Sequence, residues 1–136
     1  MRKVKYSKAH SAYFYIGSVG NKVVIISAGP HSPFDHVSVL QRSIRNITDR
    51  LKTEKVEIYV DLLSWLGDRT NRFYKMFYNK KEDKFDILSI KEIDRKHLPQ
   101  DIKATLRKFY KDKLEEIIEH SVLTKTEKRN VRINPI

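Results

Sequence analysis

Two histidines in a short loop are the side chains best suited to moving protons near neutral pH. His31 and His36 lie in the stretch Gly-Pro-His-Ser-Pro-Phe-Asp-His. Ser32, Pro33 and Asp35 are typical of a helix N-terminus, so the loop predicts an anion site built from free backbone N–H groups. A histidine beside a bound phosphate could act as a general acid or base. The same pattern also fits a plain capping loop with two solvated imidazoles.

Basic side chains on a helix and on a strand form a second candidate site, for phosphate groups. Arg42 and Arg45 are three residues apart, which places them side by side on the polar face of a predicted helix. Arg69, Arg72 and Lys75 lie in a turn and the strand after it, interleaved with aromatic residues. Guanidinium groups bind two phosphate oxygens at once, and aromatic faces stack on single-stranded bases. The alternatives are a solvated helix face and a strand whose aromatic residues belong to the core.

Positive charge is high in total and concentrated at both ends of the chain. The formal net charge is +11, from 28 Lys and Arg against 17 Asp and Glu. Residues 1–34 contain five Lys or Arg and no acidic residue, and the C-terminal residues Lys125, Lys128 and Arg129 are further candidate phosphate ligands. A domain this basic repels itself, so the excess favours a polyanionic partner, although solvated termini also tolerate charge.

The second predicted helix has its charges in the order that opposes the helix dipole. Its first half is basic and its second half acidic, with Lys103, Arg107, Lys108, Lys111 and Lys113 followed by Glu115, Glu116 and Glu119. Each misplaced surface charge costs roughly 0.3 kcal/mol. We interpret this order as an indication that the basic half faces a partner.

Acidic residues give only a weak pattern for a metal site. Glu57 and Asp61 share one face of a predicted strand with Tyr59 between them, and no third acid stands at a fixed spacing. Two carboxylates could bind a divalent cation, or they could pair with nearby lysines and arginines. The chain has no cysteine, which excludes disulfides and thiolate metal sites. We therefore expect neither a metal nor a cofactor.

Hydrophobic spacing predicts an α+β protein with a mainly antiparallel sheet of about five strands and two amphipathic helices. After a basic lead-in over residues 1–10, the expected strands are residues 13–16, 23–26, 56–66, 72–78 and 85–90, and the expected helices are residues 33–52 and 99–122. The order is β-β-α-β-β-β-α. We expect Ile44 and Leu114 in the core. Residues 1–123 form the single predicted domain, and residues 124–136 a flexible basic tail that can be removed without unfolding it.

The leading functional hypothesis is a small basic nucleic-acid-binding protein, without catalytic activity, that contacts the phosphate backbone of RNA or DNA. One alternative is a metal-independent, toxin-like ribonuclease that uses His31, His36, Tyr59, Arg69 and Arg72. The other is a protein-interaction module, of the anti-defence or immunity type, that binds an acidic partner. No apolar run approaches the ~20 residues that span a bilayer, and none resembles a signal peptide. The sequence thus predicts a cytoplasmic protein without a membrane contact.

Overall fold

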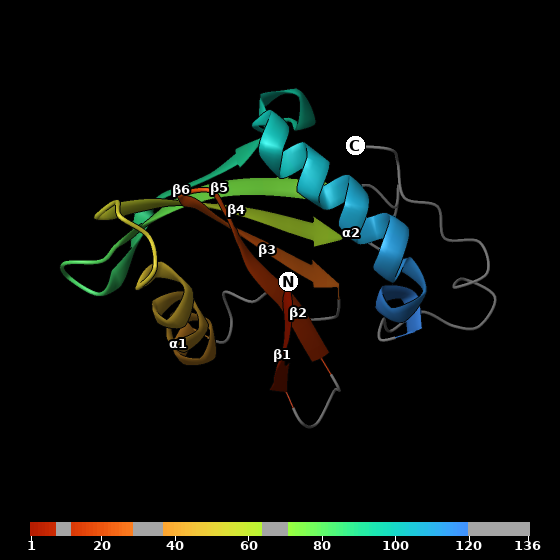
Figure 1. The fold of residues 1–136 in the computed structure, drawn as a ribbon, viewed down its shortest axis with the longest axis horizontal. Coiled ribbons are helices and arrows are strands. Elements are labelled where there is room, and N and C mark those ends of the chain that lie inside the picture. Colours follow the sequence, from red (N-terminus) through yellow and green to blue (C-terminus); the bar gives the residue numbers. More distant parts are fainter. Residues whose placement is uncertain (8–11, 29–36, 64–70, 120–136) are drawn as a thin grey trace.

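The computed structural model describes residues 1–7, 12–28, 37–63 and 71–119 (Figure 1). The elements are β1 (Arg2–Ser7), β2 (Ala12–Val19), β3 (Lys22–Ala28), α1 (Val37–Thr48), β4 (Lys55–Leu63), β5 (Asn71–Asn79), β6 (Lys84–Ile93), η2 (Arg95–His97) and α2 (Gln100–Glu119). The predicted α+β class is confirmed, with one more strand than expected.

The six strands form one sheet in which their spatial order equals their order along the chain. Strands β3 and β4 pair in parallel, and the other neighbouring strands pair antiparallel. A parallel pair needs a crossover connection, and α1 provides it between β3 and β4. Strand β4 therefore lies inside the sheet, as its two apolar faces predict.

The two helices cover opposite faces of the sheet and create two hydrophobic cores (Figure 1). Successive side chains of a strand point to opposite faces, so neighbours on β4 belong to different cores. Ile58 belongs to the same cluster as Leu40 and Ile44 of α1. Tyr59 belongs to the other cluster, with Ile102 of α2. The molecule thus has three layers, with the sheet in the middle.

Helix α1 buries the predicted apolar stripe but is shorter than its periodicity indicates. Leu40 and Ile44 are buried, and Ile47 is partly buried. The helix ends at Thr48, where a turn begins, and the N–H of Leu51 donates to the Thr48 carbonyl at 2.9 Å. Leu51 remains buried because the turn brings it back onto the same core. The predicted capping loop at residues 29–36 lies outside the described residues.

Helix α2 matches its prediction over the part whose side chains are described. Ile102, Leu106 and Phe109 are buried against the sheet. The side chain of Leu114 and the tail at residues 124–136 lie outside the described residues. Their predicted burial and flexibility therefore stay predictions.

The basic lead-in at the start of the chain contains a strand that the sequence did not predict. Residues Arg2–Ser7 form the edge strand β1, which pairs antiparallel with β2, with Arg2 opposite Ile16. An edge strand buries little apolar surface, so it shows little of the alternation that marks an inner strand. The following hairpin is also longer than predicted, because only Gly20 and Asn21 form its turn, with Gly20 at φ 60°.

Candidate functional site

Arg45 of the predicted phosphate site is bound to an acidic residue of the sheet. Its Nε donates to Oδ2 of Asp83 at 2.6 Å, and Nε2 of Gln41 donates to the Asp83 carbonyl oxygen at 2.5 Å. The hydroxyl of the buried Tyr78 donates to the other carboxylate oxygen of Asp83. Together these bonds join α1 to the β5–β6 turn. Arg45 therefore has a structural role although half of its side chain is exposed, and Arg42 is also exposed on the same helix.

Burial and hydrogen bonding at this junction shift the pKa values of Tyr78 and Asp83 in opposite directions. Burial raises the pKa of Tyr78 to about 12, and the hydrogen bond to Asp83 acts in the same direction. The hydrogen bond from Tyr78 lowers the pKa of Asp83, and Arg45 lowers it further. The carboxylate form of Asp83 is thus the form that the fold favours.

The attachment of α1 should therefore weaken in acid. Because folding lowers the pKa of Asp83, its stabilising effect is complete above about pH 4 and disappears as the pH falls through the lower folded value. We expect Asp83→Asn to reduce the urea midpoint at pH 7 and to match the wild type in strong acid. Urea unfolding followed by circular dichroism measures this, with the exposed Asp86→Asn as control. If the urea midpoints of wild type and Asp83→Asn differed equally at pH 7 and in strong acid, this role for Asp83 would be contradicted.

The predicted interleaving of cations and aromatic rings on β5 is real, but it is part of the sheet surface. The ammonium group of Lys75 lies 5.7 Å from the Tyr59 ring centroid, 5.3 Å from that of Phe77 and 3.7 Å from Oε1 of Glu57. Arg72 is exposed and, being three residues away, lies on the opposite face of β5. The structure thus places Lys75 and Arg72 apart. The other predicted ligands lie outside the described residues: His31, His36, Arg69, Lys125, Lys128 and Arg129.

The two carboxylates of the weak metal pattern have separate partners. Glu57 accepts a hydrogen bond from the hydroxyl of Tyr59 at 3.1 Å, and the buried Asp61 accepts one from the hydroxyl of Tyr110. Among the residues that the structure describes, no group of three or more His, Asp or Glu could hold a metal ion. Burial, and after it the charge of Glu57, raises the pKa of Tyr59 to about 12. At neutral pH this phenol stays protonated, so it is poorly suited to accept a proton from a substrate.

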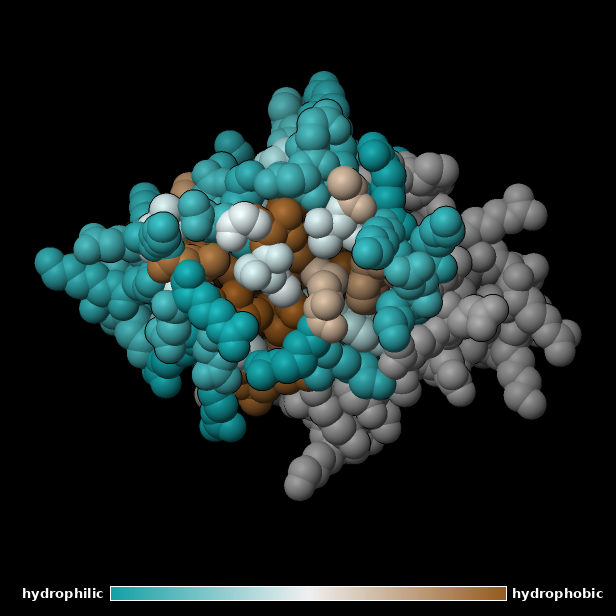
Figure 2. Space-filling view, viewed as in Figure 1, coloured by the Kyte–Doolittle hydropathy of each residue, from teal (hydrophilic) through white to brown (hydrophobic). Residues whose placement is uncertain are grey.

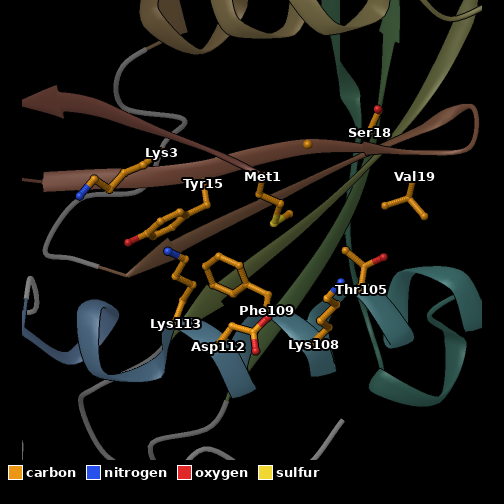
Figure 3. A pocket seen from close by; sticks show the side chains of 11 residues that line it. Met1, Lys3, Tyr15, Ser18, Val19, Thr105, Lys108, Phe109, Asp112 and Lys113 are labelled. Carbon is orange, nitrogen blue, oxygen red and sulfur yellow. The ribbon is translucent and has the colours of Figure 1, made fainter.

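A cleft of about 720 Å³ separates α2 from the β1–β2 edge of the sheet. Its floor includes Tyr15 and Phe109, whose rings meet edge to face with 4.8 Å between centroids. Lys3, Lys108 and Lys113 line it together with Asp112, its one acidic lining residue among those described. Figure 3 shows the strand residues on one side and the α2 residues on the other, with Tyr15 and Phe109 between them. The cleft therefore combines an aromatic floor with an excess of positive charge.

The two sides of this cleft have different origins in the sequence: basic residues of α2 line one side, and a glycine of β2 leaves room for Met1 on the other. Lys108 and Lys113 belong to the basic half of α2, which the sequence marks as facing a partner, although the charge pattern gave no sign of the strand side. On that side Gly17 leaves room for Met1, since a Cβ at Gly17 would come within 3.0 Å of Met1 Cγ. The space-filling view shows weakly polar and apolar residues in the middle of this face, surrounded by hydrophilic ones (Figure 2).

A model of the RnlB antitoxin family, described as antitoxin to bacterial toxin RNase LS or RnlA, matches residues 22–124. The chain belongs to the RnlB antitoxin family. The matched segment of this RnlB-family chain begins with β3 and includes α2, so it contains the α2 side of the cleft, whereas β1 and β2 precede it. No curated protein matches the chain.

Family membership favours one of the three sequence-based hypotheses. An antitoxin is a module that interacts with a toxin protein, so the RnlB match agrees with the protein-interaction alternative better than with nucleic-acid binding. No motif in the sequence revealed this family, and the nucleic-acid hypothesis came from the net charge, its concentration at both ends of the chain and the arginines of the first helix. None of the described helices is long and apolar enough to cross a membrane.

Proposed function

We propose that this protein is an antitoxin that binds a toxin of the RNase LS or RnlA type directly and blocks its activity in the cytoplasm. The observation that carries the proposal is the family match over residues 22–124. The partner is therefore a protein, and its natural activity is the cleavage of RNA.

The charge of the antitoxin restricts how such inhibition can work. A ribonuclease must present positive charge to the phosphates of RNA, and a chain with a net charge of +11 is repelled by such a surface. A basic antitoxin is therefore unsuited to imitate RNA in the toxin's substrate groove. It should instead bind an acidic region elsewhere on the toxin and block activity from there.

The cleft beside α2 has the chemistry to recognise an acidic region. Lys108 and Lys113 can pair with carboxylates, while the exposed Met1, above the buried rings of Tyr15 and Phe109, offers apolar surface to a side chain between those carboxylates. We place the acid-recognising contact here because the basic half of α2 meets the aromatic floor at this point. The charge order of α2, which is unfavourable for the isolated helix, is then offset by the partner.

A binding experiment with the toxin of the same organism tests the proposal. We expect a complex of micromolar or tighter affinity that weakens as salt is raised, because lysine–carboxylate contacts are screened. We also expect a catalytically inactive toxin to keep its affinity for a fluorescent RNA when the antitoxin is bound. Fluorescence anisotropy measures both, and the antitoxin alone with the same RNA tests the nucleic-acid hypothesis.

Three results would speak against the proposal in different ways. Absence of a complex even at low salt would remove the antitoxin function itself. Displacement of RNA by the antitoxin would place the contact in the substrate groove. Tight, salt-sensitive binding of RNA to the antitoxin alone, without binding to the toxin, would favour the nucleic-acid hypothesis instead.

A further inference from the structure

Strand β6 contains a bulge that displays two large apolar side chains. Between the pairs Phe77–Asp86 and Lys75–Lys91, residues 87–90 lie opposite a single residue of β5. Ile87 is 73% exposed and Leu88 is 98% exposed. Together with Met1, these are the large hydrophobic residues that the described part of the chain leaves exposed.

Defined hydrogen bonds fix the backbone of this bulge. The N–H of Phe77 donates to Oγ of Ser89 at 3.0 Å, and that hydroxyl donates to the Asp86 carbonyl at 2.6 Å. The Ser89 side chain thus replaces a partner that the interrupted ladder has lost. Ile90 packs against the core on the α1 side of the sheet. The bulge is therefore anchored on both sides of Ile87 and Leu88, which are held outward.

Protection of the sheet edge does not explain these residue types. Strand β6 is the last strand of the sheet, and bulges at such edges prevent pairing with other chains. Protective edges carry charged residues or proline, whereas this bulge presents isoleucine and leucine. Exposed apolar side chains held in a fixed geometry are typical of a contact surface.

The surroundings of the bulge are apolar and electrically balanced. A groove of about 510 Å³ beside it is lined by Phe77, Phe85, Ile87 and Leu88. Its charged lining consists of two lysines and two acidic residues, Lys55, Lys84, Glu82 and Asp86. Lys84 lies 3.7 Å from Glu82, and Lys55 lies over the Phe77 ring at 4.5 Å. A partner at this place should therefore gain affinity from apolar burial, and salt should change that gain little.

We infer that Ile87 and Leu88 form an apolar anchor that inserts into a hydrophobic pocket of the toxin. This inference rests on the proposed antitoxin function and adds a second contact, chemically different from the cleft beside α2. The cleft contributes a salt-dependent contact to acidic groups, and the anchor contributes a salt-independent apolar contact.

A second copy of the same chain is a poorer occupant than the toxin. Two chains that each carry a net charge of +11 repel one another, which opposes self-association. The bulge also interrupts the hydrogen-bonding edge that two β6 strands would need for pairing. A toxin with the acidic region proposed above does not meet this repulsion, and a pocket that receives Ile87 and Leu88 needs no pairing between strands.

Titration of the toxin with antitoxin variants at low and high salt tests the anchor. Leu88→Ser should weaken binding at least about tenfold, by the same factor at both salt concentrations. Leu88→Met keeps the apolar volume and should stay within about threefold of the wild type. Ile87→Ser should act like Leu88→Ser. Because both side chains are exposed, thermal unfolding of the variants should match the wild type.

The outcomes separate the anchor from the antitoxin function. If the wild type binds the toxin and both serine variants bind equally well, the anchor is wrong and the antitoxin function stands. If the wild type does not bind the toxin at all, both proposals fail together. If sedimentation shows a dimer that Leu88→Ser dissociates, with unchanged toxin affinity, the pair is a self-association surface and the inference is overturned.

Discussion

Reversal of two lysine charges in the cleft, Lys108→Glu with Lys113→Glu, is expected to weaken toxin binding about 100-fold. Each reversal replaces an attraction to a toxin carboxylate by a repulsion, so its effect is about twice that of removing the charge. The toxin should then escape inhibition. Binding by anisotropy and growth of cells that express both proteins measure the two effects.

The matched control separates a local contact from attraction by overall charge. Lys52→Glu with Lys96→Glu changes two exposed lysines outside the cleft and lowers the net charge by the same four units, from +11 to +7. We expect this control to bind within a few fold of the wild type, with a slower association rate. If both double variants lose affinity equally, the cleft has no special role and only the total charge matters.

The cleft variant and Leu88→Ser should also differ in how their affinity for the toxin depends on salt. Removal of the cleft lysines should flatten the decline of affinity with salt, since these lysines are the groups that salt screens. Leu88→Ser should leave that decline as steep as in the wild type. If Leu88→Ser flattened the decline and the cleft variant left it unchanged, the anchor would be the salt-dependent contact and the cleft the salt-independent one.

The helices were predictable from the sequence because their apolar residues recur every three or four positions, which is the spacing of one helix face. Leu40 and Ile44 on α1, and Ile102 and Leu106 on α2, lie where that period places them. The end of α1 was not predictable in this way, since Leu51 continues the stripe although the helix ends at Thr48. Periodicity reports which residues are buried, and a turn can bury the next residue as well as a helix can.

The candidate site was only half predictable, because it depends on contacts between distant parts of the chain. The charge order of α2 pointed to Lys108 and Lys113, but nothing in the sequence showed that Tyr15 lies opposite them. Likewise, Arg45 looked available for phosphate because its partner Asp83 lies 38 residues away. The bulge at residues 87–90 was hidden for the same reason, since register is a property of the pairing of two strands.

The substitution Ile44→Ala is expected to lower the free energy of unfolding by about 2–5 kcal/mol. Ile44 is fully buried between α1 and the sheet, in the cluster that includes Ile25, Ile58 and Met76. The lost methyl groups leave a cavity that closes poorly, because α2 supports the sheet from its other face. Urea unfolding should show a lower midpoint with an unchanged slope.

The exposed Arg42→Ala on the same helix is the control and should stay within about 0.5 kcal/mol of the wild type. A loss below about 1 kcal/mol for Ile44→Ala would mean that α1 does not pack on the sheet as described.

Toxin binding by the same variant adds a second comparison. Under conditions in which it is folded, Ile44→Ala should bind the toxin as the wild type does, because no residue of α1 lines the cleft or the groove beside Ile87 and Leu88. The charge reversal in the cleft should show the opposite pair of effects, with stability retained and binding lost. Stability and recognition would then depend on different sets of residues, with the α1 core responsible for the first and the cleft and anchor for the second.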